Sequence, residues 1–539
     1  MDSVALAGTL GAVAAIALTP ERSVTLRALA CAALLTVYWH HKMLWNLWRY
    51  RHFPGPMPLP LVGNISKKTK ALHEQYVVWE RKYGKTFKWF MGNNVVLVFN
   101  DVESVREIGL RHFSAFTNRA LPPTGLLQFF HPTIQNSQRY GILRAKDTYW
   151  KGIRSIAHGI LHSAEQLSSF APLMMEAAQE LSERLGKVKE GESVDIWRAL
   201  GDMTLDVVGS TVFGVRFKSV KEEGADVVKA ARIIFKNSSP FSFNNPYLLL
   251  ALVTPSFIHP VLQFFAERYP TQAMREQFWA AEHLGKVSDQ VFDLAQSGQI
   301  GSPDDPYHYN GNSFLKLFIE GHNRETNKNL SKDEVVAQAF TFLLAGYETT
   351  ANTLAYAIYL LTQNKEAEEK LVEEIDRLGK GKPGLPSIEE LKDYTYLQAV
   401  VKEVLRVFGP ATLTTRESSK DLTIHGLSVY KSTTVHLTMN SLHWNEKYFP
   451  EPQRFLPERF VEGSEIYEKQ VHRAHLPFGL GPRMCVASNF ALTEAKLALI
   501  TLYKKYRFDY DTKHEFKTAM GVTLSPVNGV RVFVRKRLA

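Results

Sequence analysis

Apolar positions along most of the chain recur every three to four residues, which is the spacing of amphipathic helices. Strand signals are few. They occur at 87–99 around Gly92, at 422–435 around Gly426, and at 522–534. Because these runs lie early and late, with long helical stretches between them, the pattern predicts one mainly α-helical domain with small β-sheets over residues 65–539.

One helix is expected to be unusually long. Ser331 and Glu334 have the spacing of a capping box, and no proline follows before Leu361. Residues 340–350 are apolar around almost the whole helix, so this part should be buried. It nevertheless contains Glu348 and Thr349, which cost free energy in an apolar interior unless they have partners or a function.

The N-terminus contains two apolar stretches, 4–18 and 28–39, each shorter than the roughly 20 residues of a comfortable membrane span. We expect residues 1–45 to form a membrane anchor of one or two apolar helices. Basic residues after the second stretch favour a cytoplasmic body. A buried helical hairpin is the alternative. Residues 46–64 are predicted to be a basic and proline-rich hinge, because proline restricts its own backbone and that of the preceding residue.

A further apolar segment, 247–265, is interrupted by Pro255 and Pro260 and is therefore too broken for a span. We expect it to dip into the membrane surface, where lipophilic substrates could enter. A pair of core helices is the alternative reading.

Charge and cysteine content narrow the classes of function. The net charge is +10 and the pI is about 9.2, which suits an anionic membrane surface, an acidic protein partner or nucleic acid. No dense Lys/Arg run or zinc-finger spacing is present, so nucleic acid is not an expected partner. The only cysteines are Cys31 and Cys485, which excludes a disulfide framework.

The run from Phe478 to Cys485 carries the strongest chemical signal. It contains two glycines and Arg483, and an amphipathic helix is predicted to follow from about residue 488 to 503. A cysteine at a helix N-terminus beside a cation is favoured as a thiolate. The alternative for a lone cysteine is a small core residue.

This run resembles the haem-binding loop of the cytochrome P450 family, Phe-x-x-Gly-x-Arg-x-Cys-x-Gly. Ala487 departs from the pattern, since the family has glycine there. The resemblance implies the P450 fold and haem b, with the Cys485 thiolate as the axial iron ligand. It also implies four haem contacts besides Phe478 and Cys485, all of them donors suited to carboxylates: Trp150, Arg154, Arg416 and Arg483. For Trp150 the alternative is core packing.

Residues 345–350 are similar to the family's oxygen-activation motif. The resemblance implies that Ala345 and Gly346 leave room for dioxygen, while Glu348 and Thr349 deliver protons. The Thr349 hydroxyl can bond back to the Ala345 carbonyl. The alternative is a pair of threonines satisfied by the helix backbone.

Glu403 and Arg406 lie three residues apart on one helix face, and Arg459 follows about 50 residues later. Alone, such a pair is usually a solvated surface pair. The resemblance implies a buried charge-paired triad that supports the cysteine loop.

The motifs resemble most the microsomal group that contains the drug-oxidising, thromboxane-synthase-like and carlactone-oxidising enzymes. This implies a monooxygenase of the endoplasmic reticulum membrane, facing the cytoplasm, that takes NADPH electrons from a membrane-bound NADPH–cytochrome P450 reductase. A peroxide-rearranging isomerase or dehydratase, and a non-catalytic haem- or lipid-binding protein, are the alternatives.

Two surfaces follow from the resemblance. A small lipophilic substrate is expected to contact residues of the loop 121–130, and also Phe340, Phe342, Ala345, Gly346, Thr412 and Val522. Basic residues on the cysteine side of the haem are candidate contacts for the reductase, or else plain solvated charges: Arg144, Lys146, Lys151 and Arg454.

Overall fold

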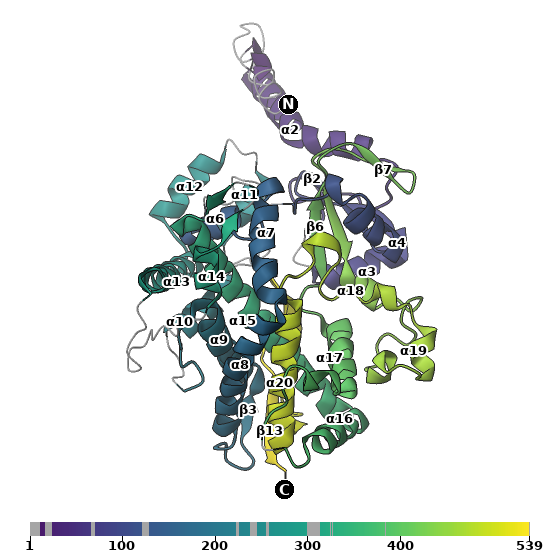
Figure 1. Ribbon diagram of the computed structural model, residues 1–539. Coiled ribbons are helices and arrows are strands. Elements are labelled where there is room, and N and C mark those ends of the chain that lie inside the picture. The colour runs from purple at the N-terminus through teal and green to yellow at the C-terminus, as the bar shows by residue number, and fades with distance from the viewer. Residues whose placement is uncertain are drawn as a thin grey trace.

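The computed structural model describes residues 11–13, 15–16, 24–65, 71–120, 129–221, 226–237, 245–254, 258–298, 313–323, 325, 327–382 and 384–537. Helices make up most of it (Figure 1). The α-helices are α2 (Val24–Arg49), α3 (Leu72–Tyr83), α4 (Val102–Arg106), α6 (Pro132–Tyr140), α7 (Asp147–His162), α8 (Ala164–Leu185), α9 (Ile196–Val208), α10 (Asp226–Asn237), α11 (Pro246–Val253), α12 (His259–Arg268), α13 (Gln272–Ser297), α14 (Phe314–Ile319), α15 (Lys332–Gln363), α16 (Lys365–Gly379), α17 (Thr395–Phe408), α18 (Met439–His443), α19 (Glu465–Lys469) and α20 (Ser488–Lys505).

The strands form small sheets. One has four strands in the order β1 (Thr86–Met91), β2 (Asn94–Phe99), β9 (Thr434–Thr438) and β6 (Leu413–Glu417), with β2 and β9 parallel. A second joins β10 (Tyr506–Tyr510), β13 (Arg531–Lys536) and β3 (Ser193–Asp195). Three two-stranded pairs are β4 (His322–Asn323) with β5 (Lys328–Asn329), β7 (Leu422–Ile424) with β8 (Leu427–Val429), and β11 (Thr518–Met520) with β12 (Leu524–Pro526). The predicted mainly α-helical class with small sheets is confirmed, and all three predicted strand regions contain strands.

The predicted long helix is α15, which has 32 residues and begins with the expected capping box between Ser331 and Glu334. It packs against α9, α17 and α20 and lies in the middle of the helical part (Figure 1). Its central residues are mostly buried because apolar neighbours surround it on nearly every side. This places the polar motif at 345–350 inside the molecule.

The N-terminal region differs from the prediction in one respect. The second apolar stretch lies in α2, but this helix continues to Arg49 and packs Met43 and Leu47 against the core beside the four-stranded sheet. Most of the first stretch, 4–18, lies outside the described residues. Among the helices that the structure describes, none has both the length and the apolar character of a membrane span. The anchor predicted for 1–45 is therefore not confirmed.

After α2 the chain is non-helical from 50 to 65, whereas residues 46–49 of the predicted hinge belong to the helix. The carbonyl of Pro54 accepts a hydrogen bond of 2.8 Å from the backbone N–H of Lys88, and Gly63 forms an isolated bridge with Met91. The segment is therefore attached to β1 along its length.

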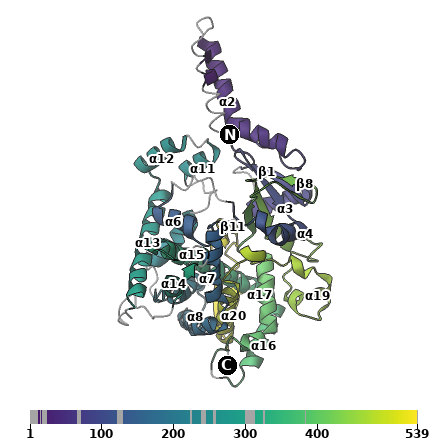
Figure 2. The same ribbon diagram turned by 45° about the horizontal axis from the view of Figure 1, so that its top comes forward.

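The apolar segment 247–265 folds into α11 and α12, with 255–257 outside the described residues. It exposes large apolar side chains, among them Leu250, Val261, Phe264 and Phe265. A pair of core helices would bury these residues. Both views place α11 and α12 at the same end of the molecule as α2 (Figures 1 and 2).

Candidate active site

The cysteine loop has a backbone that requires glycine at two positions. Gly479 and Gly481 have φ of 76° and 69°, in the left-handed region that other residues rarely adopt. A Cβ on Gly481 would also lie 2.2 Å from the Gly109 carbonyl oxygen. The Cys485 N–H donates to the Phe478 carbonyl at 2.9 Å, which closes the loop just before α20. The sequence pattern and the geometry therefore describe the same tight turn.

Ala487, the departure from the motif, fits this loop. Its φ of −99° is open to any residue, so alanine adds no backbone strain. Its N–H bonds to the Cys485 sulfur and lowers the thiol pKa. The backbone therefore does not require glycine at position 487.

The Cys485 side chain has solvent-accessible surface, although protein surrounds it on the inside of the fold. Burial is the largest influence on its thiol and raises the pKa of that thiol. The two properties agree if the side chain lies on the wall of an internal cavity. The Ala487 N–H, Arg154 and Arg119 oppose burial and lower the same pKa. They favour an anionic sulfur.

A group of guanidiniums lies close to Cys485. Burial lowers the pKa of Arg119 to about 9, with further lowering from Arg416 and Arg144 and an opposing effect from Cys485. Burial also lowers the pKa of Arg416 to about 10. The Nε atoms of Arg119, Arg144 and Arg416 are buried with no hydrogen-bond partner among the described residues. Buried donors of like charge without acceptors favour a bound anion.

Arg483 and Trp150 lie against each other beside the cysteine loop. Arg483 donates to the carbonyls of Thr117 (2.8 Å), Ile142 (3.3 Å) and Ala145 (2.7 Å), and its guanidinium stacks 3.9 Å from the Trp150 ring. Most of its donors therefore hold the cysteine loop to the segment 117–145.

Arg154 lies on the same face of α7 as Trp150 and donates to the Met484 carbonyl at 2.7 Å. Burial lowers its pKa, and Cys485 opposes that effect. Trp150, Arg154 and Arg483 thus all meet at the loop that carries Cys485.

The polar motif on α15 has one open face and one buried face. Ala345 is exposed in the middle of this otherwise buried helix, and the Thr349 hydroxyl donates to its carbonyl at 2.6 Å, as expected. Glu348 is buried, and burial raises its pKa. Its Oε1 accepts a hydrogen bond of 2.7 Å from the Ser525 hydroxyl on β12. The other carboxyl oxygen is buried without a partner in the described part of the chain.

Four of the predicted pocket residues point elsewhere. Phe340 and Phe342 are both buried in the main core, and Phe342 packs against Phe314 and Phe318 of α14. A Cβ on Gly346 would lie 2.7 Å from Val208, so this glycine allows α9 to approach rather than making room for a ligand. Thr412 is buried and donates to the Met520 sulfur.

Ala345 and Val522 are exposed, as substrate contacts would need, and Leu344 and Ala411 are also accessible. Leu344 is the neighbour of Ala345 that the sequence prediction missed. The predicted loop residues 121–128 lie outside the described residues, whereas Phe129 is buried and Phe130 half-buried.

The structure brings Glu403, Arg406 and Arg459 together, and all three side chains are fully buried. Arg406 binds both carboxylate oxygens of Glu403, at 2.7 and 2.8 Å, and Arg459 binds one of them at 3.2 Å. Arg406 also donates to the carbonyls of His443, Pro452 and Arg454. The triad therefore joins α17 to the irregular chain that leads toward Cys485.

Comparison with known proteins gives the family. The cytochrome P450 family model matches residues 53–530. Thromboxane-A synthase of Sus scrofa is 29% identical over 95% of this chain and 97% of that protein. Cytochrome P450 3A6 of Oryctolagus cuniculus is 29% identical over 89% of this chain and 90% of that protein. Cytochrome P450 3A5 of Homo sapiens is 29% identical over 91% and 92%.

The chain belongs to the cytochrome P450 family. The predicted recognition is confirmed, including the thromboxane-synthase-like part of the subgroup. The protein is thus a P450 monooxygenase enzyme, and its cofactor is haem b with an axial cysteine thiolate. Haem carries two propionates, and the unpartnered guanidinium nitrogens beside an accessible thiol fit such a dianionic group.

Sequence reasoning missed Arg119 and misassigned Arg144. Arg119 donates to the Thr414 hydroxyl at 3.0 Å and to the Arg483 carbonyl at 3.3 Å, so it lies between the cysteine loop and β6. Arg144, expected to contact a reductase, is half-buried and donates to the Ala120 carbonyl at 3.2 Å. Neither belongs to a motif with local spacing. These two arginines become neighbours only in the folded chain, where residues 117–120, 142–145 and β6 come together.

Proposed function

We propose that this P450 inserts one atom of dioxygen into a small lipophilic substrate, with Cys485 as the iron ligand and with NADPH electrons delivered by a membrane-bound reductase. The observation that carries the proposal is the combination of an accessible thiol at Cys485 with the buried acid Glu348 and the half-buried hydroxyl of Thr349 on the central helix. Cys485 is the only cysteine after Cys31 of α2, so no other residue of the catalytic body can supply a thiolate.

Haem, when bound, supplies the activation of dioxygen, which thiolate donation favours. The protein's own residues hold and move the protons. Burial raises the pKa of Glu348, which favours the protonated form that a general acid needs. The Thr349 hydroxyl is held one turn below the exposed Ala345 by its bond to the Ala345 carbonyl. Trp150, Arg154, Arg416 and Arg119 are proposed to bind the haem propionates.

The proposed electron donor is NADPH–cytochrome P450 reductase. Lys146 and Lys151 are exposed on α7 or just before it, and Arg454 is exposed shortly before Arg459 of the triad. Lys146 and Arg454 already face acidic neighbours, Glu417 at 3.6 Å and Glu451 at 2.8 Å. A reductase surface would compete with these weak exposed pairs.

Membrane association is supported by exposed apolar surface. α11 and α12 expose large apolar side chains at the end of the molecule where α2 lies (Figure 2). Apolar patches of this kind mark interaction sites. We propose that this end contacts the endoplasmic reticulum membrane from the cytoplasmic side and that lipophilic substrates enter there.

Dependence on dioxygen tests the proposal. With the purified full chain, reductase, NADPH and a lipophilic substrate found by screening for haem spectral shifts, product should form in air and not under argon. The second candidate function, peroxide rearrangement, is favoured by relatives named thromboxane-A synthase. Turnover of a peroxide substrate without dioxygen or NADPH would establish that function instead.

Ser525 is predicted to position Glu348 for proton delivery. Ser525→Ala removes the 2.7 Å hydrogen bond at Oε1 of Glu348 and leaves the contact with Thr523. We expect product formed per NADPH consumed to fall by about tenfold, below the full contribution of a general acid. The measurement compares NADPH oxidation with product. Ser525→Thr, which retains the hydroxyl, is the control. If the Ser525→Ala variant and the wild type formed the same amount of product per NADPH consumed, Ser525 would have no such role.

A further inference from the structure

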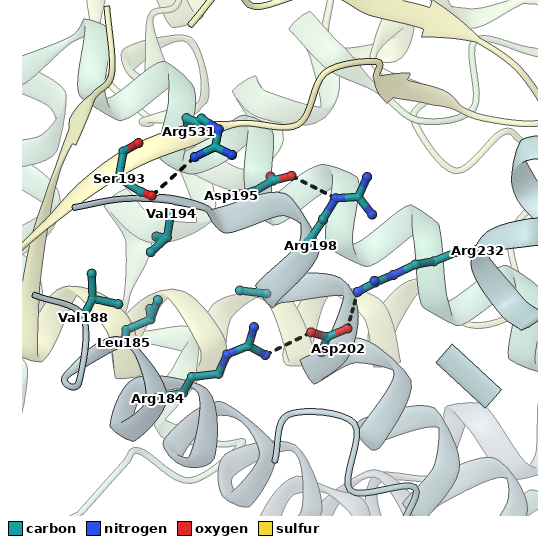
Figure 3. Close-up of a pocket in the computed structure, with 11 residues that line it drawn as sticks. Arg184, Leu185, Val188, Ser193, Val194, Asp195, Arg198, Asp202, Arg232 and Arg531 are labelled. Carbon is teal, nitrogen blue, oxygen red and sulfur yellow. Dashed lines mark hydrogen bonds and ion pairs between the residues drawn. The ribbon is translucent and has the colours of Figure 1, made fainter. Parts of the chain in front are cut away.

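A second cavity, separate from the Cys485 site, lies between the end of α8, α9, α10 and the sheet that contains β3 and β13. Its volume is about 410 Å³, within the roughly 300–1,000 Å³ typical of small-molecule sites. Its lining is four arginines, two aspartates and a set of smaller or apolar residues: Arg184, Arg198, Arg232, Arg531, Asp195, Asp202, Leu185, Val188, Ser193, Val194 and Ala199 (Figure 3).

The charges in this cavity do not balance. Asp202 is nearly buried and accepts from Arg184 at 2.9 Å and from Arg232 at 2.6 Å, so one carboxylate faces two guanidiniums (Figure 3). Arg198 pairs with Asp195 at 3.2 Å. Arg531 has no acidic partner among the described residues, and its printed contact is a long hydrogen bond of 3.5 Å to the Ser193 carbonyl. The cavity therefore has more arginines than aspartates, even after each aspartate has been paired with an arginine.

The chemistry of the lining indicates the ligand. Guanidinium groups present several N–H donors in a fixed plane and bind phosphate oxygens in pairs. Leu185, Val188 and Val194 add an apolar wall that a bare phosphate would leave unused. We propose that this cavity binds an organic phosphate, with the phosphate at Arg531 and an apolar group against the wall.

The location favours a soluble ligand over a lipid headgroup. β3 and β13 lie at the end of the molecule opposite α2, α11 and α12 (Figure 1). A chain held to the membrane by those helices would present this cavity to the aqueous phase.

The cavity also contacts the central helix. Arg232 hydrogen-bonds to the hydroxyl of Tyr347, the residue before Glu348, and the Thr204 hydroxyl on α9 donates to the Tyr347 carbonyl at 2.9 Å. Arg232 lines the same cavity, so a bound ligand that interacts with Arg232 changes this contact. Because coupling between sites is reciprocal, ligand binding at the haem and in this cavity should affect each other by the same factor. This second step rests on the proposed function, whereas phosphate binding does not.

Calorimetric titration of the haem-loaded full chain with phenyl phosphate tests the site. We expect saturable binding that Arg531→Gln weakens by about tenfold, since one charge-assisted contact is lost. Arg531 makes no ion pair with any residue that the structure describes, so this variant should remain folded. Arg216→Gln is the matched control, because Arg216 is an exposed arginine paired with Glu176 outside the cavity.

Absence of saturable binding in the millimolar range, or equal weakening by Arg531→Gln and Arg216→Gln, would overturn the site. If inorganic phosphate bound with the same affinity as phenyl phosphate, the proposed apolar part of the ligand would be refuted. If Arg531→Gln reduced binding to vesicles of anionic phospholipid, a lipid headgroup would replace the soluble ligand.

Imidazole titration of the Soret band, with and without phenyl phosphate, tests the coupling. We expect the imidazole affinity to change and Tyr347→Phe to abolish the change. The same affinity under both conditions would refute the coupling.

Discussion

Cys485→Ala should abolish the spectrum of a haem thiolate. The full chain, reduced and exposed to carbon monoxide, should show the thiolate-type Soret band in the wild type and none in the variant. The reason is that Cys485 is the only cysteine of the catalytic body, and the Ala487 N–H, Arg154 and Arg119 favour its anionic form against the effect of burial. Turnover should be lost together with the band, because thiolate donation favours O–O cleavage.

Cys31→Ala is the matched control. Cys31 is the other cysteine of the chain and lies in α2, so its removal should leave the Soret band unchanged. Circular dichroism establishes whether each variant is folded. A folded Cys485→Ala protein that kept the thiolate-type band would assign the iron ligand to another group.

The second large effect is expected from Glu403→Gln. This change keeps the shape of the side chain but leaves Arg406 and Arg459 fully buried without a counter-charge. Breaking a buried ion pair on one side typically costs about 3–5 kcal/mol, a large part of the roughly 5–15 kcal/mol that stabilises a folded domain. Chemical denaturation should show this loss, and haem content should fall because the triad supports the chain leading to Cys485.

The protein contains a solvent-exposed pair of the same chemistry and spacing. Arg454 and Glu451 are also three residues apart, at 2.8 Å, but their side chains are 63% and 56% exposed. Glu451→Gln should therefore cost far less stability than Glu403→Gln. Similar losses from Glu403→Gln and Glu451→Gln would show that burial of the triad does not determine its contribution. If Glu403→Gln does not fold, Arg459→Lys, which keeps the charge and loses the planar group, provides an intermediate value.

Gly346 shows why residue spacing within one motif is insufficient to predict which residues line the substrate pocket. Ala345 and Gly346 are both small, and the motif alone suggests one shared purpose. In the fold, successive residues of a helix point about 100° apart, so Ala345 is exposed while Gly346 meets Val208 of α9. The same rotation buries Phe342 against α14 and leaves Leu344 accessible.

Glu348 illustrates the same limit for chemistry. Its acidity and burial follow from its place in an apolar helix, but its partner Ser525 is 177 residues away on β12. Arg119, Arg144 and Arg416 likewise come from three separate segments, and the second cavity joins three helices and two strands. No periodicity within one segment could indicate these contacts.

The features that could be predicted from the sequence are those that depend on neighbours along the chain. These are the helical class, the capped long helix, the glycine-dependent cysteine loop and the hydrogen bond from Thr349 to Ala345. They arise because backbone conformation and i, i+4 geometry are local. The tertiary structure alone decided which faces are open, which acids have partners and where the arginines gather. Those properties depend on burial and on distances between segments far apart in sequence, and the physical effects concerned, desolvation and charge pairing, act through space.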